Sequence, residues 1–145
     1  MSFLLDTNAI SESSRLSPNP GFAAWLEAFG KPESREGRVS ISVLTIAELK
    51  RGILRRKARR DPIERWSAFL EAVLQTCGSN ILPVTLSVAS QWAILAETNR
   101  ANGVSVGVID EMLAATALVH DLTVVTRNVR HFEHSGCKLL SPWSE

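Results

Sequence analysis

The sequence is poor in the features that mark several large classes of protein. It has two cysteines, Cys77 and Cys137, and neither lies in a Cys-x-x-Cys pair or at ligand spacing from a histidine. This pattern argues against a zinc site, a redox pair or a disulfide scaffold, so we expect two free, mostly buried thiols. No apolar run, the longest being near Met112–Val119, approaches the ~20 residues that a membrane span requires.

The chain also lacks a large excess of charge of either sign. Its 145 residues include 16 Lys and Arg against 15 Asp and Glu, a net charge of +1. Only the distribution of these charges can therefore indicate a charged partner. The chain enters an apolar segment without the basic region and long apolar core of a signal peptide, so we expect a cytoplasmic protein with no membrane partner. The length and the lack of repeats or linkers predict a single domain spanning residues 1–145.

What the sequence does contain is an alternation of short apolar runs with longer helical patterns. The predicted strands are Phe3–Leu5, Val39–Val43, Ile81–Val84, Leu122–Thr126 and Lys138–Leu140. The predicted helices are Pro20–Phe29, Thr45–Lys57, Pro62–Gln75, Ser87–Asn102 and Ile109–His120. Continuous apolar strands separated by helices are typical of an α/β fold in which a parallel sheet is sandwiched between helices.

Local signals suggest where some of these elements begin and end. Asp61 followed by Pro62 has the form of an N-cap and first helical residue, and Thr45 with Glu48 has the spacing of a capping box. The segment Gly30–Gly37 is expected to be a surface loop.

Polar side chains follow two of the predicted strands. Asp6 comes directly after Phe3–Leu5, and Thr126 is followed by Arg127 and Asn128. Ligand sites of parallel sheets lie beyond the carboxyl ends of the strands. Because a buried carboxylate without partners costs several kcal/mol or more, Asp6 is either a solvated loop residue or a buried residue with interaction partners.

Two further acids, Glu48 and Asp110, stand near the starts of predicted helices. Each has a plain structural explanation, since a first-turn Asp can simply cap a helix or complement its dipole. Glu111 lies about 100° further round the helix and is expected to face solvent.

Together, however, Asp6, Glu48 and Asp110 would meet at one sheet edge. Carboxylates ~4 Å apart repel by about 4 kcal/mol at an effective dielectric of ~20, a penalty that Mg²⁺ or Mn²⁺ would remove. Such a cation also activates water toward a phosphodiester.

A row of basic residues continues along the predicted helix that carries Glu48. Arg51, Arg55 and Arg59 fall within about 60° of the direction of Glu48, in a segment, residues 50–60, that holds seven of the sixteen basic residues. This row is a candidate for contact with phosphate groups, and a solvated helix face is the alternative. Acids that could bind a metal, together with arginines that could bind phosphate, suggest a nuclease.

The sequence resembles the PIN-domain ribonucleases, and within them the VapC-like toxins of bacterial type II toxin–antitoxin systems. The matching stretches are FLLDTNAISE, SVLTIAELKRGI, VIDEMLAATALVHDLTVVTRNVRHFE and KLLSPW, which span most of the chain. The resemblance implies a PIN-domain-like parallel sheet between helices and a Mg²⁺-dependent endoribonuclease, with Mn²⁺ as another possible cofactor.

The resemblance also implies site residues. Three acids would be catalytic and bind the metal: Asp6, Glu48 and Asp110. The fourth catalytic position, often an Asp in PIN domains, is Asn128, which contributes no charge and makes a second tightly held metal doubtful. Side chains that would orient the carboxylates are Thr7, Asn8 and Thr126. An acid often stands in the family where this chain has His131, and we assign His131 no catalytic role.

The partners that the resemblance implies are an RNA substrate, a cognate antitoxin and a second copy of the chain, either as a homodimer or within a larger toxin–antitoxin assembly. The antitoxin tail would cover the active-site face, and operator DNA would be contacted only through the antitoxin. The row of Arg51, Arg55 and Arg59 would then contact RNA, an acidic antitoxin tail or solvent. Trp25, Trp66, Trp92 and Trp143 are candidates for these interfaces, although core packing is the favoured explanation for each.

Three other functions were weighed. A haloacid-dehalogenase-type phosphatase needs a second acid where Asn8 stands, and a response-regulator receiver needs a Lys after the last core strand, where residues 126–128 have none. The strongest rival is a catalytically weak PIN-like binding or regulatory protein that acts mainly through its antitoxin.

Overall fold

The computed structural model describes residues 1–31 and 38–145, and in these ranges the chain forms one five-stranded parallel sheet. The strands are β1 (Ser2–Leu5), β2 (Arg38–Ser42), β3 (Ile81–Leu82), β4 (Thr123–Val125) and β5 (Lys138–Leu140). Their order across the sheet is β3-β2-β1-β4-β5, so β1 is central and pairs in parallel with β2 and β4. The predicted parallel sheet is therefore confirmed.

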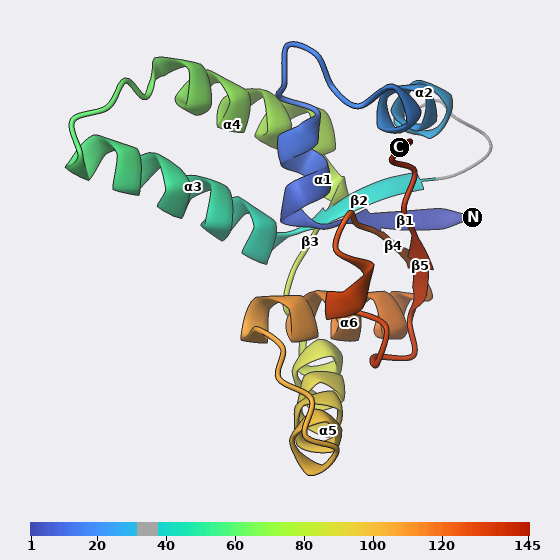
Figure 1. The fold of residues 1–145 in the computed structure, drawn as a ribbon. Coiled ribbons are helices and arrows are strands. Elements are labelled where there is room, and N and C mark those ends of the chain that lie inside the picture. The colour runs from blue at the N-terminus through green and yellow to red at the C-terminus, as the bar shows by residue number, and fades with distance from the viewer. Residues whose placement is uncertain (32–37) are drawn as a thin grey trace.

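Helices cover both faces of this sheet (Figure 1). They are α1 (Thr7–Glu12), α2 (Pro20–Phe29), α3 (Val43–Ala58), α4 (Glu64–Cys77), α5 (Leu86–Ala101) and α6 (Val108–His120), with short 3₁₀ turns η1 (Gly78–Asn80) and η2 (Val129–His131). Because successive strand residues point to opposite faces, Phe3 and Leu5 pack under α1, α2 and α4, whereas Leu4 packs against α5 and α6. The central strand is thus buried on both sides, as its continuous apolar run predicts.

The structure differs from the sequence expectation at several helix starts. Helix α1 was not predicted, because its six residues are too few for a helical period to appear. Helix α3 begins at Val43, where the Ser42 hydroxyl accepts a hydrogen bond from the backbone N–H of Leu44. Thr45 therefore lies inside the helix, fully buried, and the proposed capping box is wrong.

The proposed cap of α4 is also wrong. This helix begins at Glu64 after Ile63, two residues later than predicted, and Asp61 pairs with Arg59 at 3.2 Å instead of capping the helix. The predicted loop Gly30–Gly37 lies largely outside the described residues.

Both cysteines are free and partly buried, and burial raises the pKa of each thiol. Over residues 1–31 and 38–145 we find no helix with the length and apolar character needed to cross a membrane.

Candidate active site

Asp6 stands at the carboxyl end of the central strand and begins the first helix. Its backbone N–H donates to the carbonyl of Val125 at 3.1 Å, which continues the β1–β4 pairing. Its Oδ1 caps α1 by accepting from the backbone N–H of Ala9 at 2.8 Å, and its Oδ2 accepts from the hydroxyl of Thr126 at 2.6 Å. Only 3% of Asp6 is exposed, so this carboxylate is buried and has partners.

Burial raises the pKa of Asp6, and the negative charge of Asp110 raises it further. The hydrogen bonds from Thr126 and from the backbone of Ala9 act in the opposite direction, because they stabilise the ionised form. The net direction is upward. Asp6 is therefore a carboxylate whose ionised form is disfavoured by its surroundings, and Asp110 lies close enough to contribute to that effect.

Asp110 lies in the first turn of α6, which packs on the face of the sheet opposite to α1. Its Oδ2 is 2.8 Å from Nδ1 of His131, in the 3₁₀ turn η2 that follows β4. We assigned His131 no role from the sequence. The contact joins residues 21 positions apart in different elements, and no local sequence signal indicates it.

Glu111, next to Asp110, does not face solvent as expected. It is 8% exposed, and its Oε2 accepts a hydrogen bond of 2.9 Å from the side-chain amide of Asn99 on α5. The expectation was wrong because α6 is covered by α5 on the side where Glu111 points, and the amide of Asn99 supplies the partner that a buried carboxylate requires.

Glu48 reaches the site through Thr7. It lies in the second turn of α3 and accepts a hydrogen bond from the hydroxyl of Thr7, the residue that follows Asp6 in the chain. Thr7 thereby ties α3 to the start of α1. The carboxylate of Glu48 is partly exposed and lies near the same sheet edge as Asp6.

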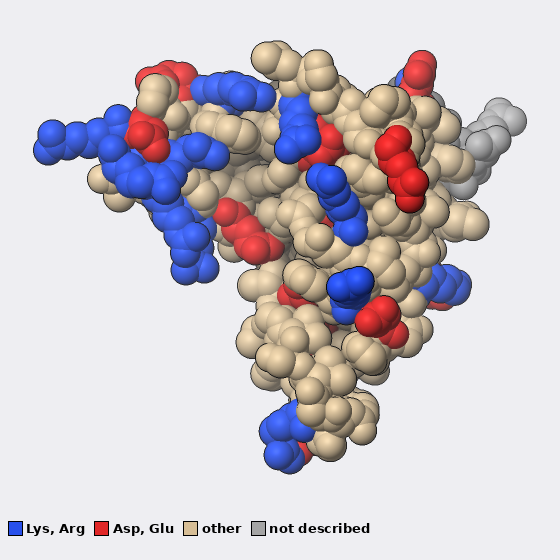
Figure 2. Space-filling view, viewed as in Figure 1, with Lys and Arg blue, Asp and Glu red and all other residues tan. Residues whose placement is uncertain are grey.

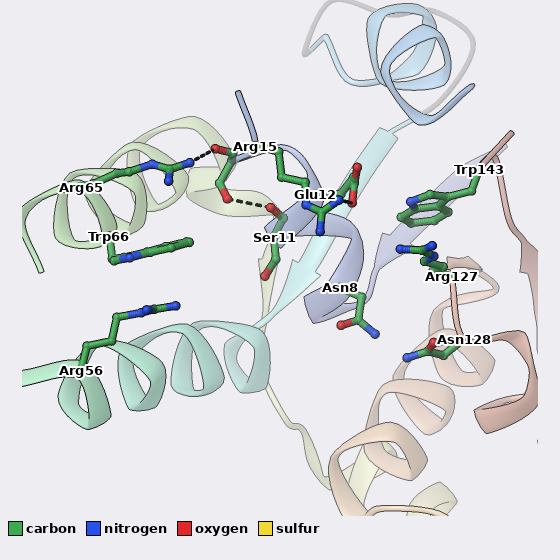
Figure 3. A pocket seen from close by; sticks show the side chains of 11 residues that line it. Asn8, Ser11, Glu12, Arg15, Arg56, Arg65, Trp66, Arg127, Asn128 and Trp143 are labelled. Carbon is green, nitrogen blue, oxygen red and sulfur yellow. Dashed lines mark hydrogen bonds and ion pairs between the residues drawn. The ribbon is translucent and has the colours of Figure 1, made fainter. Parts of the chain in front are cut away.

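On the other side of Asp6, Thr126 links the carboxylate to the loop after β4. Its fully buried hydroxyl donates to Asp6 and accepts from the backbone N–H of Asn128 at 2.9 Å. The side chains of Asn128 and Asn8 face a common cavity (Figure 3). Asp6, Thr7, Asn8, Thr126 and Asn128 are therefore brought together at one edge of the sheet.

The three acids are each held by a protein group rather than by one another. Asp6 is bound by Thr126 and Ala9, Glu48 by Thr7, and Asp110 by His131. Over the part of the chain that the structure describes, no three His, Cys, Asp or Glu side chains are grouped closely enough to hold a metal ion together.

A cavity of about 690 Å³ adjoins this edge of the sheet (Figure 3). Its lining residues come from α1, α3, α4, the loop after β4 and the C-terminal segment. They are Asn8, Ser11, Glu12, Ser14, Arg15, Arg56, Arg65, Trp66, Arg127, Asn128 and Trp143. The lining contains four arginines and one carboxylate, so its charge is predominantly positive.

The predicted arginine row does not line this cavity. Arg51, Arg55 and Arg59 are exposed on α3, and Arg59 is paired with Asp61. Figure 2 shows basic side chains gathered over the C-terminal end of α3 and the segment that leads to α4. Of the basic segment 50–60, only Arg56 reaches the cavity. Sequence reasoning missed the other three cavity arginines because they come from separate elements.

The tryptophans divide between core and cavity. Trp25 is 8% exposed and packs edge-on against Phe3 in the core, as expected. Trp92 is partly buried on α5. Trp143 stacks on Phe22 with ring centroids 4.8 Å apart and also lines the cavity, and Trp66 lies beneath the guanidinium of Arg56.

Curated relatives match nearly the whole chain. Toxin FitB of Neisseria gonorrhoeae is 32% identical over 145 residues, covering 98% of this chain and 99% of that protein. VapC ribonuclease Y4jK of Sinorhizobium fredii is 29% identical over 140 residues, covering 97% of this chain and 96% of that protein.

Solved structures agree with these matches. The crystal structure of FitAcB from Neisseria gonorrhoeae has a TM-score of 0.78 at 30% identity and covers 99% of both chains. The crystal structure of DNA-bound VapBC from Salmonella typhimurium has a TM-score of 0.79 at 25% identity and covers 98% of both chains. The profile of the PIN domain matches residues 3–136. With its parallel sheet, its acids at the sheet edge and these full-length relatives, the chain belongs to the PIN-domain family, in the branch that its VapC and FitB relatives represent.

Proposed function

We propose that the protein is a metal-dependent endoribonuclease that acts as the toxin of a type II toxin–antitoxin pair. The observation that carries the proposal is the carboxylate of Asp6 beside a predominantly positive cavity. Burial and the charge of Asp110 disfavour the ionised form of this carboxylate. The names of the relatives, VapC ribonuclease and toxin FitB, support the same activity.

A divalent cation fits the chemistry of this edge. The donors are all oxygens, which favour Mg²⁺ or Mn²⁺, and a cation would offset both the burial of Asp6 and its repulsion with Asp110. Asp6 and Asp110 would hold the ion, and Glu48, since the three acids are not grouped closely enough among the described residues to bind one ion together, would act on it through water. When bound, the ion would supply an activated water and neutralise charge on the phosphodiester. Because the fourth position is Asn128, we propose one tightly held ion.

The chain's own residues would keep the carboxylates in place. Thr126 and the backbone N–H of Ala9 fix the two oxygens of Asp6, so its orientation is set before any ligand arrives. Thr7 does the same for one oxygen of Glu48. The amides of Asn8 and Asn128 face the cavity and can donate hydrogen bonds to the oxygens of an RNA strand.

The proposed partners follow from the relatives. The similar solved structures are FitAcB and a DNA-bound VapBC. By analogy, we propose a cognate antitoxin that binds this chain, a homodimer or larger assembly, and contact with operator DNA only through the antitoxin. The site of action would be the cytoplasm, where RNA and the antitoxin are made.

The test is RNA cleavage by the antitoxin-free protein in Mg²⁺ or Mn²⁺, with and without EDTA. We expect cleavage that EDTA abolishes and that Asp6→Ala and Asp110→Ala each eliminate, together with growth inhibition in cells. A protein that binds its antitoxin tightly but shows no metal-dependent cleavage would instead be the catalytically weak PIN-like regulator. Near-wild-type cleavage by either variant would show that the acids are wrongly assigned.

A further inference from the structure

The cavity beside the acids contains two arginines that have neither an acid nor a hydrogen-bond acceptor among the described residues. Of its four arginines, Arg15 lies 3.6 Å from the carboxylate of Glu12, and Arg65 donates to the carbonyl of Ser14 at 2.7 Å. Within residues 1–31 and 38–145, the side chains of Arg56 and Arg127 have neither an acid nor a hydrogen-bond acceptor. Two guanidinium groups are thus left free to bind an anion.

Arg56 is nevertheless held in position. Its guanidinium carbon lies 4.3 Å from the centroid of the Trp66 ring, and that of Arg65 lies 5.0 Å from the same ring. Figure 3 shows Trp66 between the two arginines. A cation–π contact uses the face of the guanidinium and leaves its N–H donors free along the edge. Trp66 therefore positions Arg56 without neutralising it.

The two free arginines lie on opposite sides of the cavity. In Figure 3, Arg56 and Trp66 are on one side, Arg127 and Asn128 are on the other, and Asn8 lies between them. Arg127 directly follows Thr126, whose hydroxyl binds Asp6. The positive cavity thus extends from Arg127 and Asn128, next to the residue that binds Asp6, to the Arg56–Trp66 pair. A ligand that spans it must carry negative charge at more than one point along its length.

We infer that Arg56, positioned by Trp66, binds a backbone phosphate of the single-stranded RNA that flanks the cleaved bond, and that Arg127 binds a phosphate nearer the acids. The inference rests on the proposed function, which places cleavage at the acids. An RNA backbone repeats its charge at regular intervals, and guanidinium groups match phosphate oxygens through paired N–H donors. Asn8 and Asn128 add neutral donors along the same path, as a phosphate backbone requires.

The experiment measures binding without cleavage. In an Asp6→Asn background free of antitoxin, the anisotropy of a fluorescein-labelled oligouridylate is followed over a series of salt concentrations. Arg56→Ala should weaken binding and reduce the slope of log affinity against log salt by about 0.7. Lys57→Ala is the matched control. Lys57 is the next residue on α3 and is exposed, so its substitution removes the same charge outside the cavity. Its slope should stay near that of the parent.

Trp66 is tested by two substitutions. Trp66→Phe keeps an aromatic face for Arg56 and should retain most of the affinity, whereas Trp66→Ala should reproduce the slope of Arg56→Ala. Thermal unfolding of each variant checks that α3 and α4 stay packed. A structural role for Trp66 would lower the melting temperature without changing the salt slope of the folded fraction.

Two results would overturn the inference. The first is an equal slope for Arg56→Ala and Lys57→Ala. The second is RNA binding that survives in Arg56→Ala while binding of an oligoglutamate peptide is lost, which would assign the cavity to an acidic protein tail. Cleavage by the unsubstituted protein in Mg²⁺ is measured in parallel. Its absence would count against the proposed nuclease, whereas its presence with unchanged binding by the variants would count only against the cavity assignment.

Discussion

The hydroxyl of Thr126 donates a 2.6 Å hydrogen bond to Asp6, although the two residues are 120 positions apart in the chain. The same hydroxyl accepts from the backbone of Asn128. One buried side chain therefore connects the central strand, the proposed catalytic acid and the loop that enters the cavity. Removing this hydroxyl should affect both stability and activity.

Thr126→Val keeps the shape of the side chain and deletes the hydroxyl. We expect a loss of about 1–3 kcal/mol in the free energy of unfolding, because the buried carboxylate of Asp6 loses a donor and the partly buried N–H of Asn128 loses its acceptor. The pKa of Asp6 should rise further, since the hydrogen bond that favours its ionised form is gone. Chemical denaturation and a pH profile of cleavage measure these effects. Thr116→Val is the control, since the Thr116 hydroxyl bonds only within α6. An equal effect of the two substitutions on the cleavage profile would contradict the role of Thr126.

Asp6→Asn should make stability less sensitive to pH. The pKa of Asp6 is raised in the folded protein from its ordinary value of 3.8, so between the two values the folded state binds more protons than the unfolded state. Wild-type stability should fall as the pH rises through that window, and the penalty should persist at neutral pH. Asp6→Asn removes it, so the variant should be relatively more stable at neutral pH and lose this advantage below 3.8. Denaturation curves measured from acid to neutral pH give the comparison, and a constant difference across that range would contradict it.

Replacing His131 should change the Mg²⁺ concentration that cleavage requires. The imidazole of His131 is 2.8 Å from the Oδ2 atom of Asp110, one of the two acids that would hold the proposed cation. His131→Ala should therefore retain cleavage and need a lower Mg²⁺ concentration for half-maximal rate. His134→Ala is the control, because His134 lies near Glu133 rather than Asp110. If His131→Ala abolishes cleavage at every Mg²⁺ concentration, the imidazole takes part in the reaction itself.

Glu48→Gln should be milder than Asp6→Ala. The amide oxygen of Gln can still accept the hydrogen bond from Thr7, so the side chain keeps its orientation and loses only its charge. We expect cleavage to fall by about 10–100-fold, the range typical of groups that support a metal site from outside. Single-turnover rates at saturating Mg²⁺ measure this. A complete loss would make Glu48 an indispensable ligand.

Glu111→Ala tests the buried pair between α5 and α6. It leaves the amide of Asn99, which is 6% exposed, without its partner, and should cost about 1–3 kcal/mol in the free energy of unfolding. Glu97→Ala on the exposed face of α5 should change stability little, because its pair with Arg100 is exposed to solvent. Similar unfolding curves for the two variants would show that Glu111 is not part of the core.

The sequence predicted the features that local pattern determines. The apolar run before Asp6 identified β1, and its two-sided burial identified a parallel sheet. Helix geometry placed Asp110 and Glu111 about 100° apart, and the two residues do have different neighbours, but the expectation that Glu111 faces solvent was wrong. Which neighbour each one meets depends on where α5 packs, and a single helix does not contain that information.

The cavity was beyond sequence reasoning for a similar reason. Arg15, Arg65 and Arg127 are isolated residues in three different elements, with no shared spacing. The dense run of basic residues 50–60 predicted a phosphate-binding surface instead, although only Arg56 of these basic residues lines the cavity. Density of charge along a chain reports a basic segment, whereas a binding surface depends on which charges remain unpaired after folding.

The order of the strands has a consequence for the newly made chain. β1 is synthesised long before its neighbour β4 and the hydroxyl of Thr126, and Ser144 bonds to Asn19 just before α2. Asp6 can therefore reach its final surroundings only after the chain as far as Thr126 has left the ribosome. A ribosome-bound chain that lacks β4 carries an incomplete site, so the nuclease that we propose would gain activity toward RNA only after the segment around Thr126 has folded against β1.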